Sequence, residues 1–316
     1  MIHTEALTRS FRVGRETIEA VRGVDLDVAA GELVALLGPN GAGKSTTLRM
    51  LTSLLPPTSG TARVAGLDVA AQPAEVRRRI GYIGQKDGAG HNYRVWDELV
   101  MQGRFYGMTK ADAVASGERL LATLDLSALR MRKVSSLSDG QKRRLDIALG
   151  LVHEPVLLFL DEPSTGMDPQ NRANLWEHIM RLRAERGTTV VLTTHYLDEA
   201  DTMAERVVII DHGRVIADGT AAELKQEQAG DRLVVVVPPA QVATARAVLV
   251  DDHAVARDTP EGIELSVQVP AAARALPGAL DRLRAAGVEV VAASATQPTL
   301  DDVFLNLTGR SLREGE

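Results

Sequence analysis

The clearest chemistry-bearing stretch of the sequence is the glycine-rich segment GPNGAGKST at residues 38–46. It fits the pattern G-x-x-x-x-G-K-[ST] in full, between an expected strand at 32–38 and an expected helix at 44–55. Its glycines let backbone N–H groups turn toward phosphate oxygens, and the start of the helix adds partial positive charge. The expected nucleotide-binding residues of this phosphate loop are Gly38, Asn40, Gly41, Gly43, Lys44, Ser45 and Thr46.

Within the phosphate loop, Lys44 is expected to reach the β- and γ-phosphates, and Ser45 is expected to bind Mg²⁺. Two carboxylates, Asp161 and Glu162, follow the apolar run LLFL. A buried strand would deliver both to its C-terminal end, where Asp161 suits metal binding and Glu162 suits orienting an attacking water. The alternative is a solvated strand end with no chemistry.

A second phosphate cradle is suggested by SLSDGQKRR at 136–144, a polar turn that leads into a helix. The hydroxyl of Ser138 and the N–H of Gly140 are potential phosphate donors at the positive end of that helix. A third motif, TKAD at 109–112, matches a guanine-reading pattern. The FYGM before it reads as helical, so Thr109 is better explained as the N-cap of the next helix than as a GTP-binding residue.

These motifs are positioned by an α/β core that occupies about residues 1–225. Short apolar runs at 32–38, 81–85, 156–162, 189–195, 206–211 and 213–219 predict strands, and their alternation with helices favours a largely parallel sheet. Strand signals vanish between about 88 and 150, where three segments look helical. We therefore expect a helical subdomain inserted at about 88–150.

A smaller α+β domain is expected at 230–316. Its pattern from 232 to 294 is β-α-β-β-α-β, the order of a ferredoxin-like fold. A last helix follows at 298–310, with an apolar stripe of Leu300, Val303, Phe304 and Leu307. This stripe packs either on its own domain, which is the favoured interpretation, or against a second subunit.

The composition excludes several classes of protein. The chain has no cysteine, which excludes disulfides, zinc–thiolate sites and thiol catalysis and fits a reducing compartment. A net charge of −6 and a pI near 5.7 do not favour nucleic acid as a partner. The apolar runs are short and the first residues lack an apolar core, so neither a membrane span nor a secretory signal is expected.

The motifs together resemble those of ATP-binding cassette (ABC) ATPases. Residues 137–141, LSDGQ, resemble the signature sequence of that family, although Asp139 stands where a glycine is usual. Gln85 matches the Q-loop, Asp168 the D-loop and His195 the switch histidine, in the family's order. Phe11 occupies the place of the aromatic that stacks on adenine. The resemblance covers residues 1 to about 220.

This resemblance implies a P-loop ABC ATPase fold and ATP with Mg²⁺ as cofactors. It implies that Ser138, Gly140 and Gln141 bind the ATP of a second subunit, which explains the two cradles. Gln85 joins Ser45 and Asp161 as a Mg²⁺ ligand, and Asp168 joins the nucleotide-binding set. Lys44, Gln85, Glu162 and His195 form the catalytic set. Asp139 is expected to point outward, because a carboxylate beside a triphosphate is unfavourable.

The last helix narrows the class. PTLDDVFLNLTGR at 298–310 resembles the terminal motif of daunorubicin-resistance-type (ABC-2 type) exporter ATPases. The resemblance implies an ATPase subunit that pairs with a second copy of itself, or a paralogous subunit, and drives export of a drug or other hydrophobic compound. It would sit at the cytoplasmic face of the membrane, bound to a separate permease. The alternatives are an importer ATPase subunit and a soluble ABC ATPase acting on ribosomes or DNA.

Overall fold

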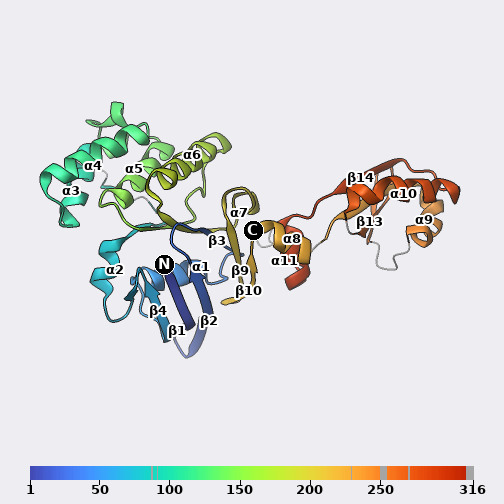
Figure 1. Cartoon of the computed structure of the whole chain (residues 1–316), viewed down its shortest axis with the longest axis horizontal. Helices are drawn as coiled ribbons and strands as arrows, with labels where there is room; N and C mark the ends of the chain where they lie inside the picture. Colours follow the sequence, from blue (N-terminus) through green and yellow to red (C-terminus); the bar gives the residue numbers. More distant parts are fainter. Residues whose placement is uncertain (87, 91, 229, 250–254, 270, 311–316) are drawn as a thin grey trace. The chain divides into compact units, whose positions relative to one another are not determined.

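Residues 1–86, 88–90, 92–228, 230–249, 255–269 and 271–310 are described by a computed structural model (Figure 1). The chain divides into two units, Met1–Gly219 and Thr220–Glu316. The mixed α/β class expected from the sequence is confirmed in both units. Within the described residues, no helix combines the length and the apolar character that a membrane span requires.

The first unit is built around a six-stranded sheet. All neighbouring strands run parallel except the edge strand β10, which is antiparallel to β9. The strands β3, β7 and β8 are buried at every residue, which explains why their sequences read as unbroken apolar runs. In spatial order the strands are β10 (Arg214–Gly219), β9 (Arg206–Asp211), β3 (Leu33–Leu37), β8 (Thr189–Thr194), β7 (Leu157–Asp161) and β6 (Ile80–Ile83).

A second, antiparallel sheet in this unit was not predicted. Its order is β2 (Glu16–Val28), β1 (Ile2–Val13), β4 (Ser59–Val64) and β5 (Leu67–Asp68). Helix α1 (Lys44–Leu51) shares one hydrophobic core with both sheets through Leu48, Met50 and Leu51. Helix α1 is therefore packed between the two sheets.

The remaining helices of the first unit are α2 (Pro73–Arg79), α3 (Val95–Phe105), α4 (Lys110–Thr123), α5 (Asp139–Leu151), α6 (Pro169–Arg186) and α7 (Leu197–Met203). Helices α3, α4 and α5 occupy the predicted insertion and pack on one another (Figure 1). The hydroxyl of Thr109 accepts a hydrogen bond from the N–H of Asp112 and caps α4. The N-cap interpretation of Thr109 is thereby confirmed.

The second unit contains the expected β-α-β-β-α-β order. The elements are β11 (Arg232–Val237), α9 (Val242–Leu249), β12 (Val255–Thr259), β13 (Gly262–Gln268), α10 (Ala272–Ala285) and β14 (Ala292–Thr296). The antiparallel sheet has the spatial order β12-β13-β11-β14. Helices α9 and α10 bury Ala245, Leu249, Ala279 and Leu283 against it.

The unit boundary lies earlier than the expected one at 225–230. Helix α8 (Ala221–Gln228) belongs to the second unit, because it packs against α11 (Leu300–Thr308), the last helix that the structure describes. Within the stripe on α11, Leu300, Val303 and Phe304 are buried and Leu307 is half-buried. The preference for own-domain packing of this stripe agrees with the contact between α8 and α11.

Two expected elements differ in length. Helix α1 ends at Leu51 rather than at residue 55, because Ser53 adopts a φ of 58° and the N–H groups of residues 54 and 55 turn back to Arg49. The strand expected at 288–294 forms only at 292–296. Its partner β11 ends at Val237 before Pro238, so residues 288–290 have no strand beside them.

Candidate functional site

The phosphate loop follows β3 and leads directly into α1. The N-cap of α1 is Gly43, with a φ of 106°, and no described side chain caps the helix. Five other helices that the structure describes, α4, α5, α6, α8 and α11, do have side-chain caps. The first N–H groups of α1, from Lys44 onward, are therefore left for an external acceptor such as a phosphate oxygen.

Two glycines of this loop are required by close backbone contacts. A Cβ on Gly38 would lie 2.1 Å from the carbonyl oxygen of Ile210, and one on Gly43 would lie 2.5 Å from that of Ala20. Gly43 also has a positive φ that side chains with a Cβ rarely adopt. The backbones of β9 and β2 thus lie directly against one side of the loop, while Asn40 and Gly41 are exposed.

Lys44 is the buried cation of the site. Its Nζ donates to the carbonyl oxygens of Gly38 at 2.6 Å and Pro39 at 3.0 Å, and lies 3.8 Å from Oε1 of Glu162. Burial lowers the pKa of Lys44, while the charges of Glu162 and Asp161 oppose that shift. The ammonium group is therefore held in the loop, between backbone dipoles and two carboxylates.

Asp161, at the end of β7, is fully buried and accepts three hydrogen bonds. Ser45 Oγ donates to its Oδ1 at 2.7 Å, Thr193 Oγ1 donates to the same oxygen at 2.8 Å, and Tyr82 OH donates to Oδ2 at 3.3 Å. Burial, followed by the charge of Asp161, raises the pKa of Tyr82. The expected pair of Ser45 and Asp161 is thus brought into direct contact, and its orientation is fixed from β6 and β8.

Glu162 lies one residue beyond β7, with a backbone φ of 48°. Its N–H donates to both the Oγ1 and the carbonyl oxygen of Thr193, which holds the strained backbone in place. Oε2 of Glu162 lies 3.6 Å from Nδ1 of His195, and Oε1 faces Lys44. Three residues of the expected catalytic set, Lys44, Glu162 and His195, therefore form one cluster.

The signature turn lies at the N-terminus of α5. Ser138 Oγ accepts from the N–H of Gln141, and Gln141 Oε1 accepts from the N–H of Ser138, so the two form a capping box. The side chain of Asp139 is 100% exposed, and its carboxylate lies 3.3 Å from Nζ of Lys142. This matches the expectation that Asp139 points outward. The turn presents Ser138 at the surface.

The D-loop residue Asp168 and the signature glycine share a neighbour that sequence reasoning missed. Asp168 caps α6 by accepting from the N–H of Asn171 at 2.9 Å, and Asn171 Nδ2 donates to its other oxygen at 2.6 Å. These bonds lower the pKa of Asp168. A Cβ on Gly140 would lie 2.9 Å from Oδ1 of Asn171, so the asparagine packs directly against the signature turn.

Gln85 and Phe11 also stand apart from the cluster around Lys44 and Asp161, as the signature turn and Asp168 do. Gln85 is exposed, two residues after the end of β6. Phe11 is half-buried near the tip of the β1–β2 hairpin, where the guanidinium of Arg9 lies 4.8 Å from its ring centroid. No described contact joins either residue to Lys44 or Asp161. Their nucleotide-binding roles remain predictions, as do the roles expected of the other site residues.

Thr193, Tyr82 and Asn171 were not predicted, although each touches a predicted residue. Thr193 had a recognisable signal, because it lies at the C-terminal end of a buried strand that neighbours β7 in the sheet. Tyr82 and Asn171 had none, since their roles depend on strand order and on the distance between α5 and α6.

The site fits a phosphate group and Mg²⁺. Ser45 and Asp161 bring a hydroxyl and a carboxylate oxygen to one point beside the uncapped start of α1. Among the described residues, no group of three or more His, Cys, Asp or Glu side chains could enclose a metal. The two oxygens of Ser45 and Asp161 suit Mg²⁺, which is usually bound by one or two protein oxygens together with phosphates and water.

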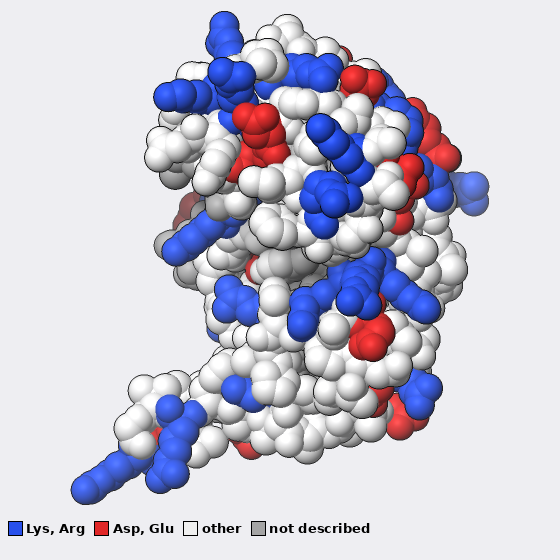
Figure 2. All heavy atoms as spheres, turned by 90° about the vertical axis from the view of Figure 1, so that its left-hand side faces the viewer, with Lys and Arg blue, Asp and Glu red and all other residues white. Residues whose placement is uncertain are grey.

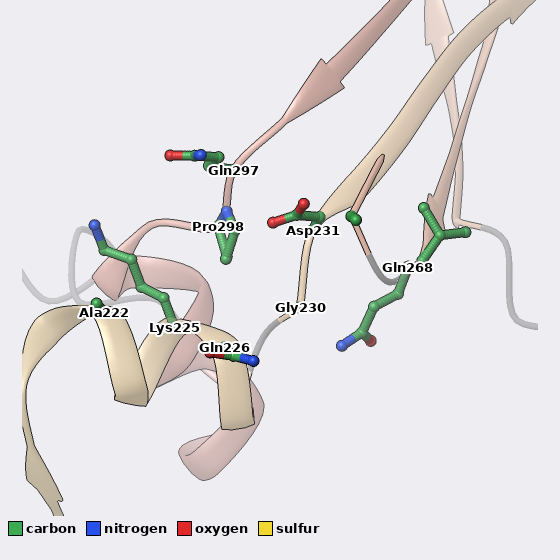
Figure 3. A pocket seen from close by; sticks show the side chains of 10 residues that line it. Ala222, Lys225, Gln226, Gly230, Asp231, Gln268, Gln297 and Pro298 are labelled. Carbon is green, nitrogen blue, oxygen red and sulfur yellow. The ribbon is translucent and has the colours of Figure 1, made fainter. Parts of the chain in front are cut away.

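A separate cavity of about 740 Å³ lies within the second unit (Figure 3). Its polar lining includes Lys225 from α8, Gln268 at the end of β13, and Asp231 and Gln297 beside β11 and β14. Asp231 accepts from the N–H of Ala272 at 3.0 Å. The described lining has no acid pair and no histidine, so its chemistry differs from that of the first unit.

Two family models match the chain. Residues 21–165 match the model described as ABC transporter. Residues 219–308 match the model described as ATP-binding protein DrrA1-3-like, C-terminal domain. The second match begins at the observed unit boundary and includes α8.

Curated relatives resemble the chain over nearly its whole length. The daunorubicin/doxorubicin resistance ATP-binding protein DrrA of Streptomyces peucetius is 44% identical, over 98% of this chain and 92% of its own. The daunorubicin resistance ATP-binding protein DrrA3 of Streptomyces coeruleorubidus is 43% identical, over 94% of both chains. Among solved structures, the dimeric post-hydrolysis state of the ATP-binding cassette MJ0796 with ADP and Pi is 25% identical. It has a TM-score of 0.64 and covers 70% of this chain and 98% of its own.

Proposed function

The chain belongs to the ABC transporter ATP-binding proteins of the daunorubicin-resistance type, and from this premise we propose that it hydrolyses Mg-ATP to power export through a separate permease. The observation that carries the proposal is the cluster of Lys44, Ser45, Asp161, Glu162 and His195 at the C-terminal edge of the parallel sheet. The edge beyond the carboxyl ends of parallel strands is where such sheets bind ligands.

Each member of the cluster has a chemical task in this proposal. Lys44 compensates negative charge on the β- and γ-phosphates. Ser45 and Asp161 hold Mg²⁺, which neutralises charge on the phosphate oxygens when bound. Glu162 orients the attacking water and accepts its proton, because it is the carboxylate next to the metal-binding one. His195, 3.6 Å from Glu162, fixes the orientation of that carboxylate.

We propose that two subunits complete each ATP site. The signature turn supports this, because Ser138 is exposed at the N-terminus of α5, a helix end suited to an anion. The solved cassette that resembles the chain is described as dimeric. Under this proposal the capping box of Ser138 and Gln141 keeps the turn shaped for a phosphate held by the other subunit.

The helical insertion is the proposed contact with the permease. Two large apolar side chains on α3, Met101 and Phe105, are one turn apart and exposed, Phe105 by 80%. Contiguous exposed apolar surface is a feature of partner contact sites, so this pair supports the assignment. Figure 2 shows the face that carries α2, α3 and α4, with Lys and Arg side chains spread across it and Asp and Glu side chains among them. Basic side chains here would face anionic lipid beside the permease at the cytoplasmic side of the membrane.

The proposed cargo is a drug or other hydrophobic compound, in line with the resistance functions in the relatives' names.

The deciding experiment is Glu162→Gln. It should reduce phosphate release from Mg-ATP by about 10²-fold or more, because the water loses its base, while ATP binding is retained. Glu177→Gln, an exposed change on α6, is the control. ATP turnover near the wild-type rate in Glu162→Gln would refute the catalytic role of Glu162. Equal drug accumulation in cells that carry the wild type and in cells that carry Glu162→Gln would refute the export role.

A further inference from the structure

Helix α5 carries two charged side chains on its buried face. Arg143 is 8% exposed and Asp146 is 5% exposed, and they lie three residues apart, so they share one side of the helix. Neither residue has a role predicted from the sequence, and neither belongs to the cluster around Asp161. Burying a guanidinium and a carboxylate costs free energy unless their hydrogen bonds are satisfied, so their contacts are informative.

Arg143 reaches two separate loops at the edge of the parallel sheet. Its Nε donates to the carbonyl oxygen of Pro163 at 2.7 Å, and its Nη1 donates to that of Gly84 at 2.7 Å. Pro163 directly follows Glu162, and Gly84 directly precedes Gln85. A single side chain from the signature helix is thus bonded next to both residues.

Asp146 holds the other side of the same loop. Its Oδ1 accepts from the N–H of Gly88 at 2.9 Å. A Cβ on Gly88 would lie 3.3 Å from that oxygen, which favours glycine there. The backbone on both sides of Gln85 is therefore bonded to one face of α5, at Gly84 through Arg143 and at Gly88 through Asp146.

We propose that Arg143 and Asp146 are positioning residues that set Gln85 relative to Glu162 and tie both to the signature turn. Helix α5 begins at Asp139, within that turn. When a phosphate engages the turn, the helix carries the loop of Gln85 with it, and Arg143 keeps that loop at a fixed distance from Glu162. The inference rests on the proposed roles of Gln85 and Glu162 in ATP hydrolysis.

The test compares two neighbouring arginines in the full-length protein. Arg143→Gln removes the bonds to Pro163 and Gly84. Arg144→Gln is the matched control, because Arg144 lies on the same helix and, among the described residues, donates to the carbonyl oxygen of Leu124 and to neither loop that Arg143 reaches. Arg143→Gln should lower kcat for Mg-ATP about tenfold or more, since small displacements of reacting groups are costly, and leave KM within about twofold. Arg144→Gln should leave both values within about twofold of wild type.

A second comparison separates positioning from a general loss of structure. On a Gln85→Ala background, Arg143→Gln should lower kcat by a smaller factor than on the wild-type background, because one of the two groups that it positions is gone. Arg143→Lys, which keeps the charge and one donor, should restore part of the activity and replaces Arg143→Gln if that variant does not fold. Asp146→Asn keeps an acceptor for Gly88 and should be milder than Asp146→Leu.

Equal losses from Arg143→Gln with and without Gln85 would overturn the inference, as would equal kcat values for Arg143→Gln and Arg144→Gln. Failure of the proposed function has a different signature. In that case Glu162→Gln would turn over ATP like wild type, whatever the arginine variants did.

Discussion

Ser45 Oγ and Asp161 Oδ1 lie 2.7 Å apart, although the two residues are 116 positions apart in the sequence. The contact joins the first turn of α1 to the end of β7, and Thr193 and Tyr82 hold the carboxylate from either side. It brings the phosphate loop and the acidic strand end together as one oxygen-rich site.

The first prediction concerns this contact. Asp161→Asn should raise the Mg²⁺ concentration for half-maximal ATP hydrolysis by about tenfold or more, because removing a ligating carboxylate weakens a hard-cation site. ATP binding in the presence of a chelator should change little. Glu177→Gln, the exposed change on α6, serves as the control. An unchanged Mg²⁺ requirement in Asp161→Asn would exclude this carboxylate from metal binding.

The second prediction concerns the two-subunit site. Ser138→Arg should abolish hydrolysis and spare ATP binding at Lys44, because it places bulk where the opposing ATP docks. Mixed dimers with Lys44→Ala sharpen the test. With one change in each subunit, one of the two ATP sites stays intact, whereas with both changes in one subunit neither does. Equal ATPase rates of the two mixed dimers would contradict a shared site.

The third prediction concerns the second unit. Phe304 on α11 is fully buried, whereas its neighbour Leu305 is exposed. Phe304→Ala should lower the free energy of unfolding of this unit by about 3–5 kcal/mol, and Leu305→Ala by less than about 0.5 kcal/mol. Denaturant unfolding, followed by a probe in this unit, measures both. If Phe304→Ala leaves stability intact but prevents subunit pairing, the stripe serves the second subunit instead.

The fourth prediction concerns pH. His153 stacks on Tyr106 with ring centroids 3.6 Å apart, and its Nε2 donates to the carbonyl oxygen of Ile80. Its Nδ1 has no hydrogen-bond partner among the described residues. Burial lowers the pKa of His153 below its ordinary value of 6.5, so below pH 6.5 the unfolded state binds a proton that the folded state excludes. The free energy of unfolding should therefore fall as pH decreases from 6.5 toward the folded-state pKa.

His153→Phe keeps the stacked ring and removes the titrating group. The unfolding free energy of the wild type minus that of this variant should decrease as the pH falls from about 7 to about 5. Urea unfolding at each pH measures both values. His212→Gln, at an exposed position, controls for a change of histidine elsewhere. If the unfolding free energy of His153→Phe depends on pH as strongly as that of the wild type, other groups are responsible for the loss of stability in acid.

Sequence alone predicted the elements whose signals are local. The phosphate loop, the strand before Asp161 and the N-cap at Thr109 all depend on residues within a few positions of one another. The β-α-β-β-α-β order of the second unit was predictable for the same reason. The strand directions follow from this order. The helix after β11 and the helix after β13 each return the chain, so that the next strand runs in the same direction, whereas the β12–β13 hairpin reverses it. With the spatial order β12-β13-β11-β14, all neighbouring strands are then antiparallel.

What sequence could not predict depends on distances between elements. The sheet that contains β1 and β2 was not predicted, because these strands are half exposed and their register shifts at bulges near Thr4 and Leu7. The boundary at Gly219 depends on the pairing of α8 with α11, more than 70 positions apart. The bonds from Arg143 depend on α5 lying over the sheet edge.

The pairing of α8 with α11 has a consequence for how the second unit can be rearranged. The first and last helices that the structure describes in this unit lie against each other, so the two ends of its described part are close together. Units with adjacent ends tolerate circular permutation and insertion into a host loop. The second unit can therefore be treated as a transplantable module, whose new ends would be placed at the β12–β13 hairpin while a short linker joins α11 to α8.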